Sequence, residues 1–221
     1  MQVFGIGQIG VERLSPSSFP SSQPIIGRMA RRKALALARI GNWLALVLVV
    51  GAVGSAGIVY LRWLYREQRY NKLIEQVAAA YDVDKLLVKA VIKRESQFDP
   101  FAYGTHGEIG LMQVTEGAGS EWARATGRRD FGRDLLWDER TNIEAGTWYL
   151  ARALRRWHDR DNPIPFALAE YNAGLGNALR WLPNGRDTTA SQFIDAISFA
   201  STRRYVKTIL ESYGAYKAEG P

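Results

Sequence analysis

The feature that most constrains this chain is a long uncharged stretch near its N-terminus. From Ile40 to Leu61 the sequence reads IGNWLALVLVVGAVGSAGIVYL, 22 residues without Asp, Glu, Lys or Arg. As a helix rising about 1.5 Å per residue, this run would be about 33 Å long, enough to cross the hydrocarbon core of a bilayer. Trp43 and Tyr60 lie near its two ends, where aromatic side chains favour the membrane interface. A buried core helix is rarely uncharged for so long, so the run predicts a single transmembrane helix over residues 40–61.

The residues around this run set its expected orientation. Basic side chains precede it, which favours an N-terminus in the cytoplasm, although further basic residues follow closely. The preceding ones are Arg28, Arg31, Arg32, Lys33 and Arg39, and the following ones are Arg62, Arg66, Arg69 and Lys72. A cleavable signal peptide is the alternative, with Gly54-Ser55-Ala56 as its cleavage site. The apolar run is long for a signal peptide, so an uncleaved signal anchor is favoured, with the rest of the chain outside the cytoplasm.

The segment before the anchor is expected to lack a fold. Residues 1–27 are rich in Gly, Ser and Pro and show neither helical nor strand periodicity. Together with the basic residues that follow, they form a predicted disordered cytoplasmic tail over residues 1–39. Met29 begins a second signal-like segment and is an alternative start of the chain.

The charge balance leaves three classes of partner open. A formal net charge of +7 fits nucleic acid, an anionic membrane surface or a polyanionic polymer such as a cell wall. Much of the excess precedes the apolar run and no nucleic-acid motif accompanies it, so we expect no nucleic-acid binding. The absence of cysteine excludes disulfides, thiolate metal sites and a Cys-linked lipid anchor. The two histidines, His106 and His158, are far apart in sequence, and we predict neither a metal nor another cofactor.

After the anchor the chain predicts an all-α fold. A linker is expected over residues 62–70, and from there apolar residues recur at helical spacing with almost no alternation. We therefore predict one compact helical domain over residues 71–217, preceded by the transmembrane helix.

Individual residues indicate where helices begin and end. Asp84 is the expected N-cap of one helix, and Asp99-Pro100 is expected to end it, because the residue before proline disfavours helical geometry. A later helix opens at Pro165, and Gly174 or Gly176 closes it.

One carboxylate lies in an unusual place on the first of these helices. Glu95 follows Val91 by four residues and Ile92 by three, so it continues the apolar face of the helix. Burial and the negative end of the helix dipole both raise the pKa of a carboxyl group. A carboxylic acid that stays protonated near neutral pH can protonate a leaving oxygen, as glycosidases require. A lone glutamate of this kind is usually a solvated helix end, so the assignment needs support from the rest of the sequence.

That support comes from five segments that occur in the order typical of one family. The chain resembles the soluble-lytic-transglycosylase-like (SLT) domain over about 140 residues. The segments are ESQFDPFA (95–102), GEIGLMQV (107–114), NIEAGTWYL (142–150), AEYNAG (169–174) and TRRYV (202–206).

The resemblance implies a lysozyme-like helical domain that binds peptidoglycan glycan strands in a long groove. It implies cleavage of the β-1,4 bond between N-acetylmuramic acid and N-acetylglucosamine without water. Glu95 would act first as acid on the glycosidic oxygen and then as base on the muramoyl C6 hydroxyl, closing a 1,6-anhydro ring. Together with the apolar run and its basic flank, it predicts a protein of the bacterial inner membrane, with a single-pass anchor and the catalytic domain in the periplasm.

The resemblance assigns roles to other motif residues. Met112 and Gln113 would line the groove beside the scissile bond. Tyr171 would hydrogen-bond near Glu95 and help to orient it, with Asn172 beside it, and Ser96 is a further candidate for substrate binding. Four motif residues are expected to be structural: Phe98, Asn142, Gly146 and Tyr149.

The sequence departs from the family pattern at several positions. Gly104 stands where the family usually has serine, nine residues after the glutamate, and Thr105 is a neighbouring substitute. Glu108 stands where a small residue is common, and Glu116 where proline often occurs. Glu170 replaces a frequent alanine. If Glu170 faced the groove, a hydrolytic route with two carboxylates would become feasible, but we expect it to point to solvent.

Two other functions compete with this one. A goose-type muramidase would share the fold but use water, and its products would carry reducing muramic ends. A catalytically silent domain would hold peptidoglycan for an envelope-spanning machine whose protein partners the sequence does not identify. Glu95 argues against the second, because a binding module has no need of an acid on an apolar face.

Overall fold

The computed structural model describes residues 25–220, and every regular element in this range is a helix. The α-helices are α1 (Ile25–Arg69), α2 (Asn71–Ala80), α3 (Lys85–Ser96), α4 (Glu116–Thr126), α5 (Glu139–Arg156), α6 (Ile164–Ala173), α7 (Leu175–Arg180), α8 (Ala190–Ala196) and α9 (Ala200–Ala218), with short 3-10 helices at Arg133–Trp137 and Gly185–Asp187. Isolated bridges from Ile109 to Tyr103 and to Val114 are the only β-type pairings among the described residues. The predicted all-α class is confirmed.

Helix α1 contains the predicted transmembrane run. The described residues include one helix long and apolar enough to cross a membrane, and its most apolar window of 18 residues has a mean hydropathy of 2.4 with nothing buried. The chain divides into two units, residues 1–56 and 57–221, so α1 belongs to both.

Helix α1 is longer at both ends than predicted. Residues 25–39 are helical, although they were expected in a disordered tail; the remainder of that tail, residues 1–24, lies outside the described residues. Ala, Leu, Arg and Lys fill the segment from Ala30 to Arg39, and these residue types have high helix propensity.

The predicted linker at 62–70 is likewise helical up to Arg69. It contains neither Gly nor Pro, and its end makes contacts with the rest of the second unit. Glu67 pairs with Lys89 at 3.3 Å, and both Arg69 and Tyr70 bond to Glu139. Because these contacts fix the last turn of α1, the segment is structured.

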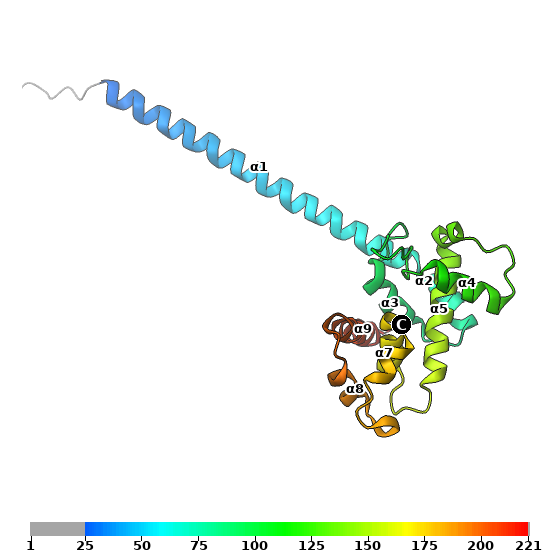
Figure 1. The fold of residues 1–221 in the computed structure, drawn as a ribbon. Coiled ribbons are helices and arrows are strands. Elements are labelled where there is room, and N and C mark those ends of the chain that lie inside the picture. The colour runs from blue at the N-terminus through cyan, green and yellow to red at the C-terminus, as the bar shows by residue number, and fades with distance from the viewer. Residues whose placement is uncertain (1–24, 221) are drawn as a thin grey trace, which may run out of the picture. The chain divides into compact units, whose positions relative to one another are not determined.

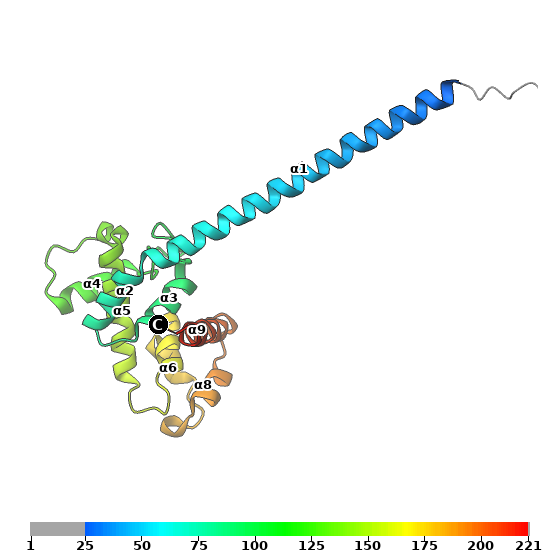
Figure 2. The same cartoon turned by 180° about the vertical axis from the view of Figure 1, so that it is seen from behind.

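The second unit is built around α6. This helix contacts α5, α7, α8 and α9, and its residues Pro165–Glu170 are all buried. In both views α4 and α9 lie on opposite sides of the domain, with α3 and the α5–α6 region between them (Figure 1 and Figure 2). Phe166 stacks on Phe193 of α8 at 4.2 Å between ring centroids and on Trp157 at 5.4 Å. Aromatic packing on α6 therefore ties the C-terminal helices to α5.

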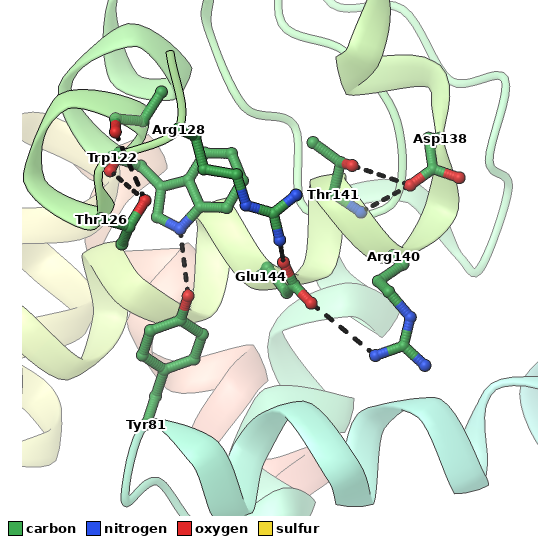
Figure 3. Close-up of polar contacts among 9 residues, drawn as sticks. Tyr81, Trp122, Thr126, Arg128, Asp138, Arg140, Thr141 and Glu144 are labelled. Atoms are coloured by element: carbon green, nitrogen blue, oxygen red, sulfur yellow. Dashed lines mark hydrogen bonds and ion pairs between the residues drawn. The ribbon is translucent and has the colours of Figure 1, made fainter. Parts of the chain in front are cut away.

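Polar contacts join α4 and α5 to the turn after α2. Figure 3 shows Trp122 Nε1 donating to the Tyr81 hydroxyl at 3.1 Å, and Arg128 pairing with Glu144 at 2.7 Å. Asp138 caps α5 by accepting from the backbone N–H of Thr141 at 2.8 Å. Trp122 thus ties α4 to the turn after α2, and Arg128 ties the end of α4 to α5.

The ends of α3 and α6 determine where the site residues lie. Asp84 caps α3 as predicted, accepting from the Leu86 N–H at 2.8 Å. However, α3 ends at Ser96 rather than at Asp99-Pro100, because Gln97 (φ 52°) and Phe98 (φ 61°) adopt left-handed geometry and Phe98 is fully buried. Gly174, with φ 82°, ends α6.

Asn142 on α5 fixes the loop that follows α3. It is almost completely buried, and its amide donates to the carbonyls of Ile109 (2.7 Å) and Leu136 (2.9 Å) while accepting from the Met112 N–H (2.8 Å). Gly110, with φ 75°, approaches this amide so closely that a Cβ would lie 2.6 Å from its nitrogen. The predicted structural role of Asn142 agrees with these contacts.

We predict that Asn142→Ala destabilises the domain by about 2–4 kcal/mol, because it leaves the buried Met112 N–H and Leu136 carbonyl without partners. Equilibrium unfolding in urea measures the loss. Asn184→Ala, at an exposed position, is the control and should change stability by less than about 0.5 kcal/mol. Equal effects of the two substitutions would contradict the assigned role.

Candidate active site

Glu95 lies in the last turn of α3, four residues after Val91 and three after Ile92, which are both fully buried. Its side chain is half-buried, as the periodicity of the sequence predicts. The Tyr205 hydroxyl, from α9, donates to Glu95 Oε1 at 2.6 Å. The contact joins residues 110 positions apart and depends on the packing of α3 against α9.

Burial raises the pKa of Glu95 to about 7, although the hydrogen bond from Tyr205 and the positive charge of Arg94 oppose the shift. The negative charge of Glu108 adds to it. A large fraction of Glu95 is therefore protonated at neutral pH, while the Tyr205 bond stabilises the ionised form. A group in this balance can both give and take a proton near pH 7.

Tyr171 lines the pocket beside Glu95 but does not bond to Glu95 itself. Its hydroxyl donates to the backbone carbonyl of Met112 at 2.9 Å, whereas the partner of Glu95 is Tyr205. Tyr171 remains close enough for the Glu95 charge to raise its pKa, after the larger effect of burial. The order of the motifs could not distinguish two tyrosines on different helices.

Met112 and Ser96 have supporting positions. The Met112 side chain is fully buried against Gly146, where a Cβ would lie 2.6 Å from the methionine sulfur. It therefore does not line the groove as predicted, because a glycine on α5 leaves a slot that the side chain fills. The Ser96 hydroxyl donates to the Leu111 carbonyl at 2.8 Å, which links the end of α3 to the loop. Phe98, also fully buried, has the expected structural role.

A hollow of about 280 Å³ opens beside Glu95, and we call it the Glu95 pocket. Its lining residues are Glu95, Gly104, Thr105, Glu108, Gln113, Thr115, Tyr171 and Asn172. The Gln113 side chain is held in place because its amide nitrogen donates to the carbonyls of Ala102 (3.1 Å) and Gly110 (2.9 Å). The exposed Asn172 accepts from the Thr202 hydroxyl at 2.8 Å. The structure thus brings Gln113, Tyr171 and Asn172 together with Glu95.

A second hollow of about 380 Å³, the Glu170 pocket, shares Gln113, Thr115 and Tyr171 with the first. Its other lining residues include Tyr149, Arg152, Arg156, Glu170 and Leu175. Because they share three lining residues, the two hollows adjoin one another.

The prediction that Glu170 points to solvent is wrong. Its side chain is 7% exposed, accepts from Trp157 Nε1 at 2.8 Å and pairs with Arg156 at 3.2 Å. Helix α6 is buried on nearly all sides, so this position faces α5, where the tryptophan and the arginine supply donors.

Glu108 is the functional candidate that the sequence did not identify. It interrupts the expected small-residue position of the second motif, and the structure places its carboxylate in the Glu95 pocket. Burial acts to raise its pKa, but hydrogen bonds from the backbone N–H groups of Glu108 and His106 outweigh that effect, and its pKa is lowered. The signal available in the sequence was a charge inside a glycine-rich motif. Among residues 25–220, no group of three His, Cys, Asp or Glu side chains has the geometry to hold a metal ion.

Comparison with known proteins identifies the family. Residues 72–194 match the family described as "Transglycosylase SLT domain". The chain is 32% identical over 160 residues to the soluble lytic murein transglycosylase of Salmonella typhimurium. This match covers 70% of this chain and 24% of the relative. It is 33% identical over 132 residues to membrane-bound lytic murein transglycosylase C of Shigella sonnei, covering 57% of this chain and 37% of the relative.

The fold comparison agrees. The inactive glutamate-to-glutamine mutant of lytic transglycosylase Slt from Pseudomonas aeruginosa superposes with a TM-score of 0.63 at 26% identity, covering 68% of this chain and 24% of Slt. The lysozyme-like helical fold predicted from the motifs is thus confirmed. The chain belongs to the SLT domain family. It spans only about a quarter of the length of the soluble relative.

We predict that Tyr205→Phe raises the pKa of Glu95 further, because a hydrogen bond to the ionised carboxylate is lost while burial remains. Carbon-13 NMR titration of the Glu95 side-chain carboxyl measures the pKa directly. Tyr171→Phe, which removes a hydroxyl bonded to a backbone carbonyl instead, is the matched control and should shift the pKa less. A lower pKa in Tyr205→Phe would contradict this account of the site.

Proposed function

We propose that this protein is a membrane-anchored lytic transglycosylase that cleaves peptidoglycan between N-acetylmuramic acid and N-acetylglucosamine. The observation that carries the proposal is Glu95, a half-buried carboxylic acid with a pKa of about 7 that opens onto a groove. The names of the relatives support this activity, as does the inactivity of a glutamate-to-glutamine mutant of Slt.

In the proposed reaction Glu95 donates its proton to the glycosidic oxygen as the bond to the anomeric carbon breaks. The carboxylate then removes the proton from the muramoyl C6 hydroxyl, whose oxygen bonds to the anomeric carbon and closes the 1,6-anhydro ring. Glu95 ends the cycle protonated, and no water is consumed. The Tyr205 hydroxyl stabilises the carboxylate between the two steps.

Three side chains are proposed to hold the glycan beside Glu95. Gln113, Tyr171 and Asn172 line the Glu95 pocket, and each is fixed by a hydrogen bond to another part of the domain. Side chains fixed in this way lose little conformational entropy when substrate binds.

One observation favours a second function, a goose-type muramidase. Glu108 in the Glu95 pocket and Glu170 in the adjoining pocket give the groove further carboxylates, and a carboxylate that activates water would make the enzyme a hydrolase. Glu170 is the weaker candidate of the two, because both of its oxygens already have partners in Trp157 and Arg156. The two functions differ in their products.

We predict that the detergent-solubilised chain releases anhydro-muramoyl products from purified peptidoglycan, and that Glu95→Gln abolishes this release. Mass spectrometry distinguishes the anhydro-muramoyl products from reducing-end products, which are heavier by one water. Glu116→Gln removes an exposed carboxylate on α4 and should retain activity. Reducing-end products would instead identify a muramidase, and wild-type protein without any product would favour a domain that only binds peptidoglycan.

We also propose that α1 anchors the protein in the bacterial inner membrane as a single span, with the helical domain in the periplasm. The apolar run and the membrane-bound relative support this location.

We predict that the chain stays in the membrane pellet after alkaline carbonate extraction, and that protease degrades the domain in spheroplasts but not in intact cells. Val49→Arg combined with Val53→Arg should weaken insertion, since each arginine costs about 2.5–3.5 kcal/mol at the centre of a span. Protection of the domain in spheroplasts would contradict the orientation.

A further inference from the structure

Glu108 has no role in the reaction as described, yet its carboxylate lies in the same pocket as Glu95. It belongs to the loop between α3 and α4, and its side chain is 25% exposed. The backbone N–H of His106 donates to Glu108 Oε2 at 2.9 Å, and His106 Nδ1 lies 3.4 Å from Oε1. These contacts hold the carboxylate at the pocket while leaving part of it open to a ligand.

Gly104 makes room for this carboxylate. A Cβ atom built on Gly104 would overlap Glu108 Oε2 and lie 2.9 Å from its Cδ. The φ angle of Gly104 is not in the left-handed region, so the backbone does not require glycine there. The absence of a side chain at 104 is therefore a matter of space. Gly104 is also the position where the family usually has serine, so here the Glu108 carboxylate fills space beside that position.

The pKa values of the two carboxyl groups in the pocket are shifted in opposite directions. Burial raises the pKa of Glu95 to about 7, whereas backbone hydrogen bonds hold that of Glu108 below its ordinary value. Near neutral pH the pocket thus combines an acid that is still partly protonated with a negative charge. Such a separation is typical of sites in which one carboxyl group donates a proton and the other stabilises positive charge.

We propose that Glu108 is a second catalytic carboxylate, which contacts the bound glycan and stabilises the positive charge that develops at the anomeric carbon as the glycosidic bond breaks. This inference rests on the proposed function. The anomeric carbon becomes electron-deficient when Glu95 protonates the leaving oxygen, and it stays so until the C6 oxygen bonds to it. A fixed negative charge on that side of the pocket lowers the free energy of this transition state more than that of the bound substrate.

Glu108→Gln tests the proposal, because it keeps the shape of the side chain and removes its charge. We expect kcat to fall roughly tenfold to a hundredfold, with a smaller change in KM and with anhydro products unchanged in kind. Glu116→Gln removes the same charge from an exposed position eight residues further on and should leave kcat within about twofold. Thermal unfolding of each variant verifies that it is folded.

The pH dependence of activity distinguishes a catalytic role of Glu108 from a purely structural one, which would leave it unchanged. The other groups that act on Glu95 are Arg94 on its own helix, Tyr171 on α6 and Tyr205 on α9. The Glu108 charge opposes ionisation of Glu95, so its removal lowers the pKa of Glu95. Activity requires protonated Glu95 and is lost as pH rises through that pKa. The alkaline limb of the profile should therefore shift to lower pH in Glu108→Gln.

Gly104→Ala tests the same carboxylate by displacing it rather than by removing its charge. The added methyl group would overlap Glu108 Oε2 and lie 2.8 Å from Gln113 Oε1, so kcat should fall at least as far as in Glu108→Gln. An active wild type with unchanged kcat and pH profile in Glu108→Gln would overturn this proposal alone. Wild-type protein that cleaves no glycan would overturn the proposed function as well.

Discussion

The site depends on the partial burial of one carboxylic acid at the junction of α3 and α9. Glu95 continues an apolar helix face, so the packing that buries Val91 and Ile92 also removes much of the water around its carboxyl group. Desolvation alone would raise the pKa of this acid further. The Tyr205 hydroxyl, at 2.6 Å, limits that effect. The proton affinity of Glu95 is thus a compromise between burial and one hydrogen bond, and it requires helices from both ends of the domain.

The shape of the groove beside Glu95 depends on the loop after α3, and contacts from α5 hold this loop in place. Asn142 satisfies three backbone groups of the loop and the neighbouring 3-10 turn, and Gly146 accepts the buried Met112 side chain. Both residues are on α5, which in turn packs on α6. Residues of the SLT motifs therefore divide into two groups. Some, such as Gln113 and Asn172, reach the pocket, and others keep the backbone that carries them in position.

Much of this could be predicted from the sequence, for reasons that are local. Helical periodicity placed Glu95 on a buried face, and the capping role of Asp84 follows from its own side chain. What depends on tertiary packing could not be predicted. Tyr205 and Tyr171 are equally plausible partners for Glu95 until α9 is placed against α3, and Met112 is buried only because Gly146 lies beneath it. Glu170 and Glu108 are charges whose partners, Arg156, Trp157 and the backbone of His106, lie outside any motif.

We propose that the glycan itself, rather than water, supplies the nucleophile, even though Glu108 adds a second carboxylate to the pocket. Digestion of purified peptidoglycan in water enriched in oxygen-18, followed by mass spectrometry of the muropeptides, tests this most directly. A nucleophile from the glycan would give anhydro-muramoyl ends without incorporated oxygen-18. Reducing ends that carry one oxygen-18 atom would contradict this proposal, because water would then be the nucleophile.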